Sequence, residues 1–203
     1  MKRSLLSGVL FTFLVIVSAP EGFSYRILYK EQLWNLYHQQ LYMYPLDIAE
    51  NIHWLEQALR ADFANPLYAL SKIENPQEWE KYRYLFSMHI NLTLVDLYLQ
   101  WASKHMKFEP RFFNYPWREA NLESFDKAQT LLEFALIYWD EAKRYSDMTQ
   151  KFPWLFLTEV QYWEDENFRI QTGSLDYAEI IQRHLSRLDE TRQFFASMDE
   201  STY

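Results

Sequence analysis

At one point in the chain, glutamate and histidine side chains have a spacing that could bind a metal ion. Glu50 and His53 lie three residues apart, so on a helix both side chains would project from one face. Di-iron helical bundles need two Glu-x-x-His motifs of this kind plus two further glutamates, and the chain contains no second motif. We therefore expect His53 to be solvated or to act as a helix cap, and we expect no metal site.

The other ionisable candidates are scattered along the sequence. Four further histidines occur singly: His38, His89, His105 and His184. His89 lies among apolar residues, where a hydrogen-bonded core histidine is more common than a catalytic base. The acidic run 164–166 could bind a cation, but such runs usually form a solvated helix face. No Gly-x-Ser-x-Gly or Walker motif occurs, and we expect neither catalytic residues nor a cofactor.

Aromatic side chains are concentrated in residues 108–121, "FEPRFFNYPWREAN", which we expect to be a non-helical insertion. Five of its residues are aromatic: Phe108, Phe112, Phe113, Tyr115 and Trp117. Exposed aromatics beside arginines are typical of interface hot spots, and they could also stack on sugar rings. The alternative is that they fold back and fill a gap between helices.

The composition indicates how such side chains would be positioned. The chain has 203 residues, of which 49% are hydrophobic, 19% are aromatic and three are glycine. Because tight hairpins and phosphate loops need glycine, its scarcity favours an all-α fold. The net charge of −8 and the absence of a Lys/Arg cluster argue against nucleic-acid binding. The absence of cysteine excludes disulfides and thiolate chemistry.

The N-terminus resembles a secretory signal. Lys2 and Arg3 precede an uncharged apolar stretch, residues 5–17, which is too short to span a bilayer comfortably. We expect residues 1–24 to be a signal peptide cleaved near Ser24, which would place a single domain, residues 25–203, in a bacterial periplasm. An uncleaved anchor and a buried N-terminal helix are the alternatives.

Apolar periodicity predicts helices over most of the remaining chain. Two interleaved apolar rows run through residues 77–107, so this helix should be buried on two faces. Residues 122–145 follow the same pattern. We also expect helices over 29–43, 46–63, 153–171 and 175–196, with prolines between several of them.

Small residues recur at fixed positions in three segments. The large residue Phe125 is followed three residues later by the small residue Ala128, and Ala135 lies seven residues further on. Ala178 likewise follows a large residue at a distance of three. Gly173 precedes the last segment where a tight turn would need it. This pattern resembles the second helix of a tetratricopeptide repeat. The resemblance implies about three degenerate, stacked antiparallel helical hairpins, an α-solenoid. An irregular helical bundle is the alternative.

A second resemblance covers residues 63–92, "FANPLYALSKIENPQEWEKYRYLFSMHINL". This stretch is similar to periplasmic helical-repeat proteins of spirochaetes, some of which build a collar around the flagellar motor. The similarity implies a scaffold role in an envelope or flagellar-motor assembly.

Together these features predict a non-catalytic adaptor that binds another protein, an envelope component, with self-association as a further possibility. The membrane would be contacted through the signal segment alone. Eight residues are the candidate binding residues: Tyr84, His89, Tyr162 and Arg169 on the first helices of the pairs, and Phe112, Phe113, Tyr115 and Trp117 in the insertion. A small-molecule or glycan binding module that uses residues 108–121 is the second hypothesis, and an enzyme of unrecognised type is the third.

Overall fold

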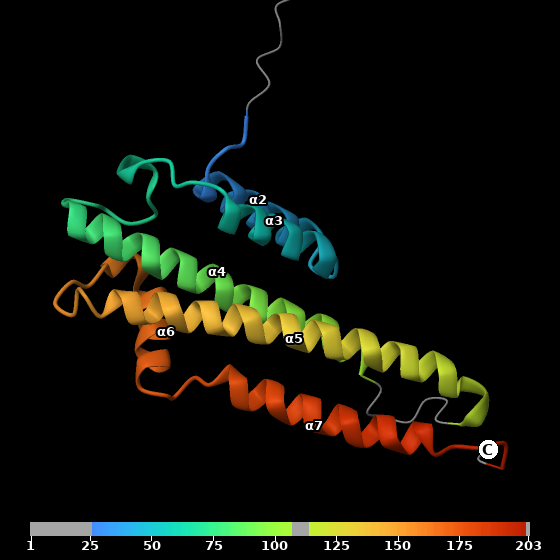
Figure 1. Ribbon diagram of the computed structural model, residues 1–203. Coiled ribbons are helices and arrows are strands. Elements are labelled where there is room, and N and C mark those ends of the chain that lie inside the picture. The colour runs from blue at the N-terminus through green and yellow to red at the C-terminus, as the bar shows by residue number, and fades with distance from the viewer. Residues whose placement is uncertain (1–25, 107–113, 202–203) are drawn as a thin grey trace, which may run out of the picture.

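A computed structural model describes residues 26–106 and 114–201. Within them it contains six α-helices and no β-strand (Figure 1). The expected all-α class is therefore confirmed. The predicted signal peptide and the aromatic residues Phe108, Phe112 and Phe113 lie outside the described residues. The helices are α2 (Lys30–Met43), α3 (Ile48–Arg60), α4 (Pro76–His105), α5 (Arg118–Thr149), α6 (Gln161–Gln171) and α7 (Tyr177–Ala196).

Side-chain caps explain where several helices begin. The Asn75 side chain accepts hydrogen bonds from the backbone amides of Gln77 and Glu78, and Pro76 occupies the first helical position. Asp176 caps α7 in the same way through Ala178 and Glu179. Hydrogen bonds between residues close in sequence thus define where these helices start.

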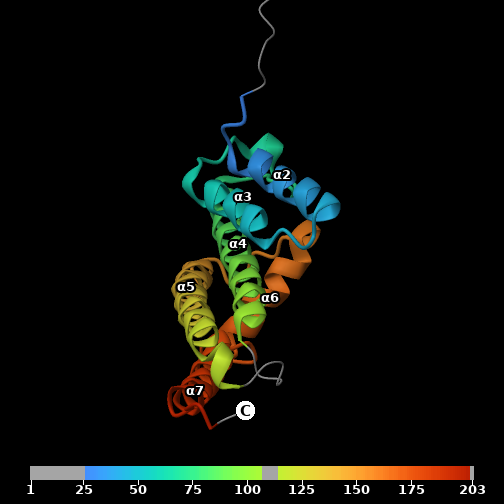
Figure 2. The ribbon, with the colours of Figure 1, turned by 90° about the vertical axis from the view of Figure 1, so that its right-hand side faces the viewer.

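The two longest helices, α4 and α5, form an antiparallel hairpin that is the centre of the molecule (Figure 1). The α2–α3 hairpin packs on one side of α4 and α7 packs on α5, so Figure 2 shows these elements in succession from one end of the molecule to the other. The expected burial of α4 on two faces is confirmed, because both predicted apolar rows contribute buried residues. Within the described residues, no helix combines the length and apolarity needed to cross a bilayer.

The alanine row of α5 lies in the core, as the spacing predicts. Ala128, Ala135 and Ala142 have no exposed surface, and Phe125 and Trp139 on the same row are buried beside them. Small side chains here allow neighbouring helices to approach closely. At the N-terminus of α5, the Arg118 guanidinium donates hydrogen bonds to the Phe195 and Ala196 carbonyls, each at 3.0 Å, and so caps the C-terminus of α7.

The C-terminal helices differ from the expected third hairpin. The main packing partners of α6 are α4 and α5, and that of α7 is α5, so the two helices pack mainly on the long hairpin and not on each other. The helix expected from Pro153 begins later, at Gln161, because residues 152–157 form a turn and an irregular segment, and a short 3-10 helix (Thr158–Val160) follows them. The non-helical insertion is also shorter than expected, since residues 118–121 form the first turn of α5.

Gly173 occupies the turn between α6 and α7, where its backbone adopts a left-handed conformation with φ +71°. A Cβ atom built there would meet nothing within 4 Å, so the backbone angle and not crowding favours glycine. The sequence therefore identified the correct turn, although the helices on either side pack on other elements.

Candidate functional site

Helix α6 is unusual because three of its four buried side chains are polar and two of its three aromatic side chains are exposed, while Trp163 is buried. Glu164, Glu166 and Asn167 are buried, while Tyr162 and Phe168 are 66% and 64% exposed. A helix on the surface of a globular protein normally shows the reverse arrangement. The buried polar groups must therefore have partners in the neighbouring helices, because an unpaired buried charge is strongly destabilising.

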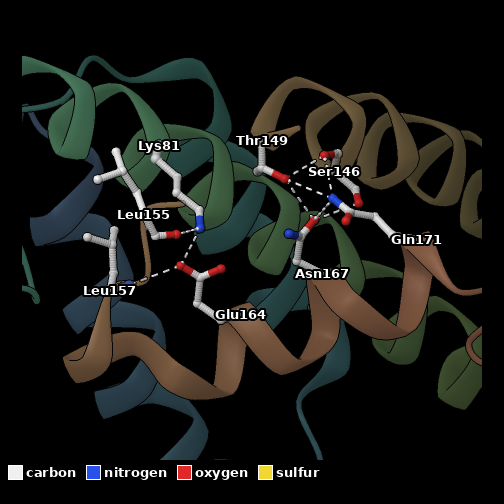
Figure 3. Close-up of polar contacts among 8 residues, drawn as sticks. All are labelled: Lys81, Ser146, Thr149, Leu155, Leu157, Glu164, Asn167 and Gln171. Atoms are coloured by element: carbon white, nitrogen blue, oxygen red, sulfur yellow. Dashed lines mark hydrogen bonds and ion pairs between the residues drawn. The ribbon is translucent and has the colours of Figure 1, made fainter. Parts of the chain in front are cut away.

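One of these partnerships is a buried ion pair between α4 and α6 (Figure 3). The Lys81 ammonium lies 2.7 Å from Glu164 Oε1, and the two side chains are 5% and 6% exposed. Lys81 also donates to the Leu155 carbonyl, and Glu164 Oε1 accepts the Leu157 amide at 3.0 Å. The pair thus fixes the chain that leads into α6 as well as the helix itself.

A neutral network holds the next turn of α6 to the end of α5 (Figure 3). Asn167 Oδ1 accepts hydrogen bonds from the Ser146 hydroxyl at 2.6 Å, the Thr149 hydroxyl at 3.1 Å and the Gln171 amide at 3.1 Å. Ser146 and Thr149 are almost fully enclosed. Because one oxygen receives three donors, the orientation of the Asn167 side chain is fixed.

The other flank of α6 meets α4 at His89. The His89 Nδ1 atom lies 2.7 Å from Glu166 Oε2, and the imidazole stacks on Trp163 at 5.2 Å between ring centroids. Tyr162 contacts the same ring edge-on at 5.7 Å, and the adjacent Glu166 carboxylate raises the pKa of the Tyr162 hydroxyl. The structure thus brings together two of the sequence-predicted residues, His89 and Tyr162, and His89 is hydrogen-bonded as expected.

A cavity of about 600 Å³ opens beside the Lys81–Glu164 pair, at the connection between α5 and α6. We call it the α5–α6 cavity. Its polar lining includes Glu164, Asp165 and Asn167, and its aromatic wall consists of Phe152, Trp154, Phe156 and Phe168. Trp154 is 90% exposed and Phe156 58%. Aromatic side chains exposed to this extent around a cavity are typical of a binding surface.

The other predicted site residues lie elsewhere. Tyr84 donates a hydrogen bond to Glu80 at 2.5 Å, which raises the pKa of its phenol, and Lys151 lies over its ring. Arg169 is exposed on α6. Tyr115 is half-buried and packs against the core, while Trp117 is 49% exposed. None of the predicted residues that the structure describes lines the α5–α6 cavity.

The expectation of a solvated face over residues 164–166 was wrong for two of the three acids. Glu164 and Glu166 are buried against Lys81 and His89, and Asp165 between them is exposed. A run of acids suggests solvent exposure, but residues two apart on a helix point to different flanks, and each flank here meets a cation or a histidine of α4. His53 is exposed, and among residues 26–106 and 114–201 no group of three His, Asp or Glu side chains could hold a metal ion.

Sequence reasoning missed the aromatic wall of the cavity. Its signal is the segment "KFPWLFL", residues 151–157, where a proline follows an aromatic and the apolar residues do not repeat at helical spacing. The expected helix over 153–171 includes residues 153–157 of this segment, and a helix there would bury part of its aromatic side chains. The partners Lys81 and Glu164 carry no recognisable motif, because their pairing depends on how α6 crosses α4.

The fold defines an all-α protein in which a long antiparallel hairpin carries a short helix with an exposed aromatic surface. Residues 77–198, more than half of the chain, match the family described as a domain of unknown function, DUF8513. The chain belongs to that family, and the match spans every helix from α4 to α7 and thus the whole candidate site. No curated protein and no solved structure matches the chain.

Proposed function

We propose that this protein is an exported, non-catalytic adaptor that binds another protein of the cell envelope through the outer surface of α6 and the segment before it. The observation that carries the proposal is the reversed burial of α6. Its buried polar side chains hold the helix in place, and Phe168 faces outward beside Trp154 and Phe156 of the preceding segment, around one cavity.

Interface energetics support a protein partner. Large aromatic side chains dominate hot spots because they bury much area and lose little side-chain entropy. The buried Lys81–Glu164 pair and the Asn167 network attach α6 and the segment before it to α4 and α5, and a preorganised surface loses less entropy when the partner binds.

The scaffold proposal rests on the hairpins. The α2–α3 and α4–α5 pairs and the buried alanine row of α5 support a degenerate, tetratricopeptide-like stack to which α6 and α7 are added. The resemblance of residues 63–92 to spirochaetal periplasmic proteins makes an envelope assembly such as the flagellar motor the first process to test.

Site-directed photo-crosslinking tests the adaptor function. A benzophenone amino acid replaces Phe156 in the protein expressed in its native cells, and a second protein carries it at Lys127, an exposed position on α5 away from the cavity. We expect one defined protein to be captured from position 156 and not from position 127. Its purified form should bind the unmodified chain, and the double substitution Trp154→Ser, Phe168→Ser should abolish that binding. Equal capture from both positions would exclude this surface as the adaptor interface.

Export is tested separately by determining the N-terminus of the protein recovered from the cell envelope. We expect a mature chain that begins near Tyr25. An intact N-terminus in envelope fractions would favour the anchored alternative, and recovery from the cytoplasm alone would contradict export.

A further inference from the structure

The α5–α6 cavity contains two polar atoms for which the described residues provide no partner. Glu164 receives Lys81 and the Leu157 amide on Oε1, and its Oε2 atom accepts no hydrogen bond from any described residue. Asn167 receives three donors on Oδ1, and its Nδ2 atom donates to none of the described residues. Both residues are 6% exposed and line the cavity. In Figure 3 the Asn167 nitrogen and the second Glu164 oxygen point toward the same space.

These two atoms form a complementary pair. A carboxylate oxygen accepts a hydrogen bond and an amide nitrogen donates one, and both are held in fixed orientations one turn apart on α6. Because Lys81 neutralises Glu164, the pair itself favours a neutral ligand over a charged one. A trans peptide bond that lies between the two atoms matches such a pair, since its N–H and C=O groups project in opposite directions from neighbouring atoms of the chain.

The walls of the cavity indicate what accompanies that peptide bond. Phe152, Trp154, Phe156 and Phe168 form an apolar surface that can enclose a large side chain. Residues 155–157 belong to no helix, the Leu157 backbone is extended, and the Phe156 amide donates no hydrogen bond to any described residue. An extended chain lying beside this segment could therefore pair with its backbone as well.

We infer that the α5–α6 cavity binds an extended segment of the partner protein, with one peptide bond held between Glu164 Oε2 and Asn167 Nδ2 and one large apolar side chain held against the aromatic wall. This inference rests on the proposed adaptor function and names the part of the partner that is recognised. The adaptor proposal does not require this cavity to bind a peptide, because a partner could bind the outer aromatic surface alone.

The probes for the test are blocked pentapeptides, acetyl-Ala-Ala-X-Ala-Ala-amide, in which X is Leu, Phe, Trp, Pro or Ala. Each is titrated into the isotope-labelled chain, and two-dimensional NMR follows the Asn167 side-chain amide and the Trp154 indole N–H. We expect at least one peptide with a large X to shift both signals with saturation, and the peptide with X as Ala to bind about tenfold more weakly or not at all, since it lacks one buried side chain.

Two substitutions test the two halves of the site. Glu164→Gln keeps an oxygen for Lys81 and presents an N–H₂ group in place of Oε2, so the acceptor becomes a donor. Phe156→Ser removes one side chain of the aromatic wall, and because Phe156 is more than half exposed the substitution should leave the fold intact. We expect each to weaken peptide binding by about tenfold, the size of one hydrogen bond to a charged group or one buried side chain. Phe194→Ser is the matched control, because Phe194 is 53% exposed on α7 and does not line the cavity.

The outcomes separate this inference from the adaptor proposal. Weaker binding in Phe156→Ser with unchanged binding in Phe194→Ser supports it, even if Glu164→Gln fails to fold. The inference is overturned if no pentapeptide shifts the Asn167 and Trp154 signals, or if either Phe156→Ser or a folded Glu164→Gln protein binds as well as the unmodified chain. It is also overturned if a chitotriose probe shifts these signals and the peptides do not, which would indicate a saccharide site. A partner still captured from position 156 in either case would leave the adaptor function standing without this cavity.

Discussion

Lys30 shows how a single charged side chain can link two helices. Its ammonium donates to the Ala58 carbonyl at 2.8 Å and the Leu59 carbonyl at 2.6 Å, and so caps the C-terminus of α3 from the first residue of α2. Carbonyls at a helix C-terminus attract a cation, but this one is 92% removed from water. Burial lowers the pKa of Lys30 to about 8, although Asp62 and Glu31 act in the opposite direction.

The lowered pKa of Lys30 predicts a stability that rises with pH. Between pH 8 and the ordinary lysine pKa of 10.5, the unfolded chain binds a proton that the folded chain has released. The free energy of unfolding of the unmodified chain should therefore increase relative to that of Lys30→Met by about 1–2 kcal/mol between pH 7.5 and 9.5. Urea denaturation at several pH values measures this difference. A difference that stays constant or falls with pH would contradict the role assigned to Lys30.

The Lys81–Glu164 pair allows a second test at the residue scale. Removing one partner leaves a buried charge without compensation, so Lys81→Met should lower the free energy of unfolding by about 3 kcal/mol. The double substitution Lys81→Met, Glu164→Leu should recover part of that loss, because no isolated charge remains. Lys72→Met is the control, since the pairing of Lys72 with Glu74 is exposed to solvent and its loss should change stability far less than the loss of the buried pair. Equal effects of Lys72→Met and Lys81→Met would show that the buried pair is not structural.

The turn between α6 and α7 depends on the backbone conformation of one residue. Gly173 has a left-handed backbone conformation and open space around its Cα. Gly173→Ala should therefore destabilise the protein by about 1 kcal/mol, through the backbone angle alone. Gly173→Asn should cost less, since asparagine tolerates this conformation better. Thermal unfolding ranks the melting temperatures of the unmodified chain, Gly173→Asn and Gly173→Ala, which we expect to fall in that order. Equal melting temperatures for the alanine and glycine proteins would indicate that the turn can relax without loss.

The helices that sequence reasoning placed well are those whose packing follows from their own periodicity. The α4 rows and the α5 alanines show their buried faces directly, and Asn75 and Asp176 mark helix starts by local hydrogen bonding. Helix α6 behaves differently. Its buried face is chosen by Lys81 and His89 of α4 and by Ser146 of α5, which are distant in sequence. No local pattern reveals such partners, so the candidate site was missed although its helix was expected.

At the scale of the whole molecule, α4 is the element on which the rest depends. It packs on α3, α5 and α6, and residues from both of its faces are fully enclosed, among them Leu85, Ile90 and Leu94. The α2–α3 hairpin packs on it mainly through α3, which places α2 at one end of the molecule (Figure 2). Elements with fewer neighbours usually open at lower free energy than the global transition.

Hydrogen exchange should therefore divide the molecule into a slow centre and faster ends. We expect the α4 amides between Leu85 and Leu97 to exchange slowest, and the amides of α2 and α3 to exchange together and faster. Leu55→Ala, a truncation of a fully enclosed side chain in α3, should speed exchange in α2 and α3 more than in α7. Leu188→Ala in α7 is the matched truncation at the other end and should produce the opposite ranking. Mass spectrometry of peptides from the exchanged proteins measures these rates in the unmodified chain, in Leu55→Ala and in Leu188→Ala. If α2, α4 and α7 exchange at one common rate in every protein, the chain unfolds as a single cooperative unit and the α2–α3 hairpin cannot open by itself.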